Sequence, residues 1–186
     1  MTQPPQYPPI CDADWPEEIA DMLPGFAGGL NVYRTMAHNP ALLRAWADLR
    51  EHVVNRTVLG KQRSEVVILR TGVRLGSPYE WQQHVARARK CGMDDGRILS
   101  LRGAPEDMSE EDAILARAVD ELFSSHRLSS GSAAAVAGLV GPKGVIDVIA
   151  TVGFYSTLGY LLNTAGTPLD DDIAAELAAA PLPGET

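Results

Sequence analysis

Two glutamates and a histidine carry the residue types and the spacing that acid–base chemistry needs. Glu80 and His84 are four residues apart, so on a helix their side chains share one face. Glu65 lies near the start of the preceding predicted helix, and a turn at Gly76-Ser77 folds that helix back against the next one. Two carboxylates can therefore meet one imidazole, fix its tautomer and tune its pKa for proton transfer near neutral pH.

A purely structural interpretation of the same residues stays open. Ser77-x-x-Glu80 matches a capping box, with Pro78 at the favoured first helical position. Glu80 would then only start a helix, and a Glu–His pair at this spacing is common on helix surfaces. Two carboxylates and a histidine could also bind a metal ion. However, the second Glu-x-x-His copy of a di-iron bundle is missing, so we predict no metal site.

Composition narrows the possible partners. The chain has 186 residues and a net charge of −8, which disfavours binding to nucleic acid or to an anionic membrane. Cys11 and Cys91 lie far apart, so we expect two reduced thiols in a cytoplasmic protein. The first residues lack the features of a signal peptide. The apolar stretch 144–165 contains Asp147 and further polar residues, and this favours a buried helix over a membrane span.

Helical periodicity, Ala-rich tracts and an aromatic content of 6% predict an all-α fold of about seven or eight helices. Residues 1–29 are rich in proline, and we expect an extended N-terminal arm there. Residues 30–166 form the predicted helical domain, with helices beginning at the Asn39-Pro40 cap, at Ser64, at Ser77 and at Ser109. A small helix near 132–140 precedes a long one over about 142–163. The tail 167–186 is expected to hold one or two helical turns near 172–180.

The run from Arg63 to Gly92 resembles the carboxymuconolactone decarboxylase family, which includes the alkylhydroperoxidase D-like proteins. The similarity extends over about residues 38–165, and its most specific part is Glu80-Trp81-Gln82-Gln83-His84 with Glu65 upstream. The resemblance implies an all-α domain that assembles as a homo-oligomer, a trimer or a hexamer, with its site between helices near a subunit interface.

The hydroperoxidase branch of this family uses an upstream Glu followed by C-x-x-C-x-x-x-H. Glu65 and His84 match that pattern, but Ser77 and Glu80 stand at the two cysteine positions. A hydroxyl and a carboxylate cannot cycle through a disulfide, so an antioxidant role of this type is the least favoured function.

The decarboxylase branch shows E-[FW]-x-x-H, which this sequence fits, and it removes CO2 from a lactone dicarboxylate without a cofactor. That reaction requires a stabilised dienolate and a positioned proton donor. The resemblance implies that His84 moves the proton while Glu80 or Glu65 orients it. Arg63 and Arg70 are candidates to anchor substrate carboxylates. Trp81 is a candidate to contact substrate, although packing is its more common role.

These observations favour a cofactor-independent, decarboxylase-like lyase that acts on a small organic acid or lactone. A non-catalytic helical binding or scaffold protein remains the alternative. The two interpretations differ in one respect that geometry can address. The enzyme requires Glu65, Glu80 and His84 to converge beside a cavity, whereas the scaffold does not.

Overall fold

The computed structural model describes residues 7–184, and within that range every regular element is helical. This confirms the predicted all-α class. The elements are η1 (Asp12–Asp14), η2 (Glu17–Met22), α1 (Phe26–Gly29), α2 (Asn31–Met36), α3 (Pro40–Glu51), η3 (His52–Arg56), α4 (Lys61–Leu75), α5 (Pro78–Lys90), α6 (Asp95–Ser100), η4 (Pro105–Asp107), α7 (Glu110–Ser125), α8 (Ser130–Ala165) and α9 (Asp171–Ala179).

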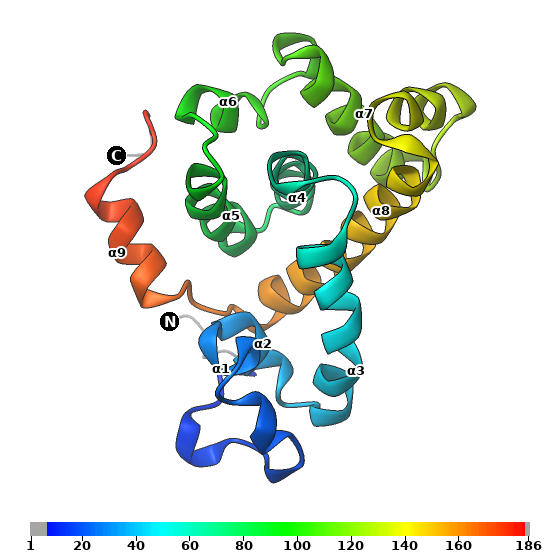
Figure 1. Cartoon of the computed structure of the whole chain (residues 1–186). Coiled ribbons are helices and arrows are strands. Elements are labelled where there is room, and N and C mark those ends of the chain that lie inside the picture. Colours follow the sequence, from blue (N-terminus) through cyan, green and yellow to red (C-terminus); the bar gives the residue numbers. More distant parts are fainter. Residues whose placement is uncertain (1–6, 185–186) are drawn as a thin grey trace.

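Helix α4 lies in the middle of the molecule, and α5, α7 and α8 pack around it (Figure 1). Its run Val66-Val67-Ile68-Leu69 is almost fully buried, with exposed fractions of at most 3%. An apolar run without alternation is expected for a helix that has neighbours on every side. The helices around α4 therefore determine where its few polar side chains can point.

The turn between α4 and α5 fixes how closely the two helices approach. Gly76 ends α4 in the left-handed conformation (φ 56°), and the Ser77 N–H donates a 3.0 Å hydrogen bond to the Gly72 carbonyl. A Cβ added at Gly72 would lie 3.3 Å from the Cβ of Glu80. Glycine at position 72 therefore allows α5 to fold back tightly along α4, as the sequence indicated.

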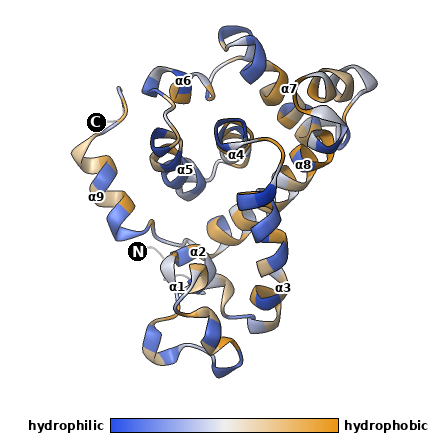
Figure 2. Cartoon of the chain, viewed as in Figure 1, coloured by the Kyte–Doolittle hydropathy of each residue, from blue (hydrophilic) through white to orange (hydrophobic). Residues whose placement is uncertain are grey.

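Figure 2 shows many hydrophilic residues on α4 and α5, although both helices lie inside the bundle. Several of these residues are buried, and their charges or polar groups face other helices: Glu65, Arg70, Glu80, Gln83 and His84. Buried charges are unfavourable unless they are paired or held neutral. Each of them therefore needs a physical explanation.

The N-terminal segment differs from our prediction of an extended arm over residues 1–29. Residues 1–6 lie outside the described part of the chain, but η1, η2 and α1 fold residues 12–29 into short helical turns. Ile19 and Met22 are buried in one cluster with residues of α2, α3 and α8. The prolines delimit the turns, since Pro16 directly precedes η2, while the apolar residues between them dock on the bundle.

The described part of the tail, residues 167–184, packs on the domain. Helix α9 packs on α5, and Leu182 is 2% exposed. Asp170 accepts hydrogen bonds from the Asn31 N–H and from the Tyr79 hydroxyl, so it connects the tail to α2 and α5. The helical turns expected near 172–180 correspond to α9.

Helix α8 contains the break that the sequence predicted between 140 and 142. Gly141 has φ 77° and ψ 168°, and Pro142 follows it. By length and composition α8 is the one helix of the described chain that could cross a membrane, and half of its most apolar window is buried within the protein. A core helix of a bundle has the same properties.

The conformation of Gly141 provides a test of this kink. Its φ and ψ lie in a region that is essentially restricted to glycine. We therefore expect Gly141→Ala to lower the free energy of unfolding by about 1–3 kcal/mol. The control Gly138→Ala, in the helical and open part of α8, should raise it by up to about 1 kcal/mol. Urea unfolding measures both variants, and equal effects would contradict a strained kink.

Candidate active site

Glu65, Glu80 and His84 converge between α4 and α5. The Nδ1 atom of His84 and Oε2 of Glu65 share a 2.6 Å hydrogen bond, in which the ring N–H donates to the carboxylate. On the other side of the ring, Nε2 lies 3.5 Å from Oε2 of Glu80. All three side chains are buried, with exposed fractions of 9% or less. The imidazole thus stands between two carboxyl groups in a site largely shielded from water.

The capping-box interpretation of Ser77 and Glu80 is wrong. Ser77 occupies the N-cap position of α5, but its side chain makes no capping hydrogen bond. Glu80 turns inward toward His84 instead of reaching back to the helix start, and its Oε1 atom is buried without a hydrogen-bond partner among the described residues. Helix α5 therefore lacks the capping hydrogen bonds that Ser77 and Glu80 could have made, and the Glu80 carboxyl group lies at the histidine instead.

A small cavity of about 20 Å³ adjoins Glu80 and His84. Tyr33 and Tyr155 line it together with two cationic side chains, Arg50 and Arg87. The Tyr155 ring stands edge-on to the imidazole, with 4.9 Å between the ring centroids. A volume of this size corresponds to roughly one water molecule. The cavity thus brings an acid, a histidine and two positive charges to one small space.

Burial raises the pKa of Glu80 to about 8; the positive charge of Arg87 opposes this rise, and the negative charge of Glu65 adds to it. Near neutral pH the Glu80 carboxyl therefore keeps its proton. Burial also raises the pKa of Tyr155 well above its ordinary value. A neutral carboxyl group in an apolar site is a suitable proton donor.

Glu65 faces a second, larger cleft of about 270 Å³. Three cationic side chains line it: Lys61, Arg87 and Lys90. Ser64 contributes a buried hydroxyl that has no hydrogen-bond partner among the described residues. Val54, Arg87 and Tyr155 line both this cleft and the small cavity, so only a few side chains separate the two spaces. The cleft suits an anionic small molecule that approaches the buried site.

Comparison with known proteins relates this arrangement to a family. Residues 40–121, from α3 into α7, match the model of the carboxymuconolactone decarboxylase family. This segment carries the sequence pattern of that family. The matched range contains Glu65, Glu80 and His84, so the converged residues lie within the matched segment and not in the flanking segments. No curated protein sequence matches the chain.

Two solved structures share the fold. An uncharacterised peroxidase-related protein from Silicibacter sp. TM1040 superposes with a TM-score of 0.74 at 14% identity, over 93% of this chain and 97% of that one. A variant of the debrominase Bmp8 in complex with 2,3,4-tribromopyrrole gives a TM-score of 0.69 at 14% identity, over 96% and 98% of the two chains. At this identity the similarity establishes the fold alone.

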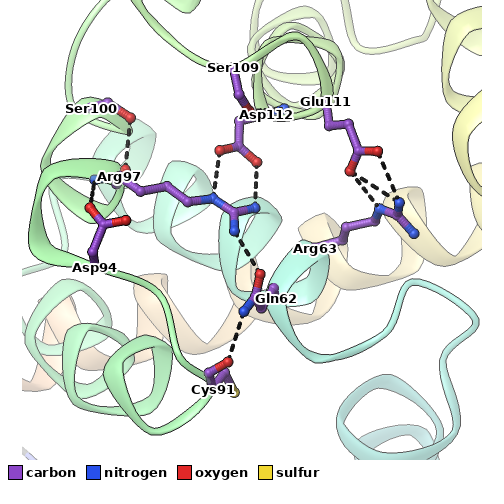
Figure 3. A network of polar contacts seen from close by, with 9 residues as sticks. All are labelled: Gln62, Arg63, Cys91, Asp94, Arg97, Ser100, Ser109, Glu111 and Asp112. Atoms are coloured by element: carbon purple, nitrogen blue, oxygen red, sulfur yellow. Dashed lines mark hydrogen bonds and ion pairs between the residues drawn. The ribbon is translucent and has the colours of Figure 1, made fainter.

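Within the segment that matches the carboxymuconolactone decarboxylase family, the arginines that we considered as substrate anchors lie away from the histidine. Arg63 pairs with Glu111 of α7 at 3.0 Å, at the edge of a polar network that also joins Gln62, Arg97 and Asp112 (Figure 3). Arg70 is buried, pairs with Asp120 at 2.6 Å and donates to the Leu101 and Gly103 carbonyls. Both residues connect α4 to its neighbours, and neither lines the two spaces beside the triad.

Trp81 is 4% exposed and belongs to the apolar core cluster around α4, and it lines neither of the two spaces beside the histidine. The structure thus brings together the three proposed catalytic residues but not the three proposed substrate contacts.

Sequence reasoning missed Arg50, Arg87 and Tyr155. A signal for Arg87 was present, because it follows His84 by three residues and Gln83 by four, and therefore shares their helix face. Arg50 and Tyr155 come from α3 and α8, far away in the sequence, and no local spacing indicates that they meet α5.

The raised pKa of Glu80 predicts a pH dependence of stability. The folded protein keeps a proton on Glu80 that the unfolded chain releases above its ordinary pKa of 4.5. Stability from this group is therefore complete below about pH 4.5 and decreases as the pH rises toward about 8. The slope is at most about 1.4 kcal/mol per pH unit for one proton.

We expect Glu80→Gln to reduce this decrease, since an amide does not titrate. Urea unfolding between pH 5 and pH 8 measures the difference in slope between the variant and the parent, with exposed Glu111→Gln as the control. Identical slopes in Glu80→Gln and the parent would contradict a protonated Glu80.

Proposed function

We propose that this protein is an acid–base enzyme that acts on a small organic acid or lactone, with loss of CO2 as the leading reaction. The observation that carries the proposal is the position of His84 between two carboxyl groups, with Nδ1 2.6 Å from Glu65 Oε2 and Nε2 3.5 Å from Glu80 Oε2. The cavity beside it is lined by two arginines. The match to the carboxymuconolactone decarboxylase family supports the same class of chemistry.

In the proposed reaction the substrate carboxylate leaves as CO2, and the electron pair of the broken C–C bond moves into an adjacent carbonyl to form a dienolate. Arg50 and Arg87 stabilise the negative charge that develops on oxygen. Protonated Glu80 then donates its proton to the carbon that lost CO2, and its unpartnered Oε1 is the atom available for this step.

His84 restores the proton of Glu80 in this scheme: the imidazole takes up a proton from water, and the imidazolium then transfers a proton from Nε2 to the Glu80 carboxylate. Its Nε2 atom is 3.5 Å from the Glu80 carboxyl, which is too long for a good hydrogen bond but requires only a small approach. Glu65 fixes the ring orientation through Nδ1 and stabilises the imidazolium after proton uptake. This proposal differs from the sequence-based prediction, which gave the proton transfer to His84: here Glu80 protonates the substrate, and His84 supplies the proton to Glu80.

Access to the site is proposed to run through the larger cleft. The small cavity of about 20 Å³ cannot hold an organic acid, whereas the cleft of about 270 Å³ can hold much of one. Arg87 and Tyr155 border both spaces. Movement of the Arg87 side chain toward a substrate carboxylate would join the two spaces, and binding would then supply the room that the reaction needs.

A thiol-dependent antioxidant function has less support. Cys91 lines the larger cleft, but burial raises the pKa of its thiol, and the negative charge of Glu65 adds to this rise. A thiol that keeps its proton is a poor nucleophile.

The scaffold alternative has one observation in its favour, namely the small size of the cavity beside His84.

Substitution of His84 and Glu80 tests the acid–base proposal against the scaffold. We expect His84→Gln and Glu80→Gln each to lower turnover at least about 100-fold, because general acid–base groups contribute factors of this size. The assay follows CO2 release from a panel of lactone carboxylates and 3-oxo acids. The control is His38→Gln, since the exposed His38 ring contacts the Pro8 carbonyl and the Tyr7 ring, away from the site. Full activity in a folded His84→Gln variant would refute the proposal, as would an absence of turnover across the panel in the parent.

Arg87 gives a second, independent test through the pH–rate profile. Glu80 acts in its protonated form, so the rate should fall as the pH rises through its pKa of about 8. Arg87 lowers that pKa, and Arg87→Met should therefore move the alkaline limb to higher pH. The lost charge should also raise KM about 10-fold or more. Arg63→Met, which breaks a pair with Glu111, should leave both quantities unchanged. An unmoved alkaline limb in Arg87→Met would argue against Glu80 as the donor.

A further inference from the structure

A further cleft, separate from the two spaces beside the triad, lies where α4 ends and α5 begins. Its volume is about 530 Å³, and its walls are two glycines of the α4–α5 turn together with Val73, Ser77, Pro78, Trp81, Gln82 and Arg102. None of Glu65, Glu80 and His84 lines it. The cleft therefore needs an explanation separate from the proton-transfer site.

Two buried hydrogen-bonding groups at this cleft have no partner among the described residues. Ser77 is 2% exposed and Trp81 is 4% exposed, and neither Oγ of Ser77 nor Nε1 of Trp81 makes a hydrogen bond there. A buried donor without a partner costs about 1–3 kcal/mol. Two such donors that border one cleft indicate a ligand that accepts hydrogen bonds.

The electrostatics of the cleft favour a negative charge. Among the residues that the structure describes, no aspartate or glutamate lines it, and the guanidinium of Arg102 lies 4.1 Å from the centre of the Trp81 ring. The first turn of α5 also begins at this cleft, and its backbone N–H groups form the positive end of the helix dipole. Ser77, at the N-cap position, leaves these groups without the side-chain cap that serine usually provides.

The remaining walls are apolar. Val73 and Pro78 present hydrocarbon surface, Gly76 exposes backbone without a side chain, and the buried residues Gly72 and Trp81 complete the lining. A ligand with a flat apolar body can pack on these surfaces while its charged end meets the donors. Inorganic phosphate would satisfy the donors but not the apolar walls.

We propose that this cleft is a binding site for a small aromatic or unsaturated carboxylate. Its carboxylate accepts hydrogen bonds from Ser77 Oγ and Trp81 Nε1 near the start of α5, and its apolar body packs between Val73, Pro78 and the Trp81 ring. The site is distinct from the one proposed for proton transfer, and it extends the proposed function to a second place where an organic acid binds.

Isothermal titration calorimetry with sodium benzoate on the full chain tests this site. We expect saturable binding at one site to the parent protein. Ser77→Ala and Trp81→Phe each remove one donor and keep most of the packing, so each should weaken binding about 3- to 10-fold. Benzamide has the same shape but no charge, and it should bind at least about 10-fold more weakly than benzoate.

The matched control is Trp46→Phe. The Trp46 Nε1 atom is also buried without a partner among the described residues, but Trp46 lies on α3, is stacked on Phe154 and does not line this cleft. Benzoate affinity should not change in this variant. The proposal fails if the parent shows no saturable binding, if benzamide binds as tightly as benzoate, or if Trp46→Phe weakens binding as much as Trp81→Phe does.

His84→Gln separates this site from the proposed enzyme activity. We expect this variant to bind benzoate with the affinity of the parent, even though it loses turnover. If His84→Gln abolished benzoate binding, the carboxylate would occupy the catalytic cavity, and the separate site would be refuted. If instead the parent bound benzoate with the predicted effects of Ser77→Ala and Trp81→Phe but turned over no acid in the panel, the proposed function would fail and the binding site would stand.

Discussion

The hydrogen bond between Glu65 and His84 is the interaction on which the rest of the site depends. It is buried, 2.6 Å long, and joins two helices that have little room between them. A charged or polar group in such a place is stable only with a partner. Once Glu65 holds Nδ1, the ring has one orientation, and its Nε2 atom must face Glu80. Glu80 in turn has no strong partner, and burial therefore keeps it protonated. One contact thus determines the orientation of the histidine, while burial determines the chemical state of the neighbouring acid.

The fold supplies this contact through close packing. Gly72 allows α4 and α5 to approach each other, and Gly76 reverses the chain with a left-handed residue. On its other faces, α4 is fixed to its neighbours by Arg70, which pairs with Asp120 and two backbone carbonyls. Arg70 cannot also hold a substrate, because its guanidinium already makes four hydrogen bonds to these fixed partners. The arginines that are available to the site, Arg50 and Arg87, come from helix faces that point to the cavity.

The sequence was sufficient to predict what local spacing determines. The four-residue interval between Glu80 and His84, together with the turn at Gly76, predicted the meeting with Glu65. The predicted helices over about 132–140 and 142–163 left a gap between them at the place where Gly141 breaks α8. It was not sufficient where distant segments meet. Arg50 and Tyr155 reach the cavity from α3 and α8, and nothing in their own neighbourhoods indicates it. The proline-rich start was misjudged for a related reason: proline disfavours long helices, but it does not prevent Ile19 and Met22 from docking on a core built elsewhere. Proximity in sequence to Glu65 was equally misleading for Arg63, which points to α7.

The distribution of unpartnered polar groups argues against a purely structural role for the middle of this bundle. Five of the eight buried polar side-chain atoms without a partner in residues 7–184 lie on or next to α4 and α5: those of Ser64, Ser77, Glu80, Trp81 and Gln83. A sixth, Nε of Arg50, belongs to a residue that lines the cavity. Each such group costs about 1–3 kcal/mol, and the missing serine cap of α5 costs about 1 kcal/mol more. Apolar residues of similar size would have removed this cost without any change of fold. Selection for stability alone would not keep six such groups together, whereas selection for binding polar ligands on two sides of α5 would.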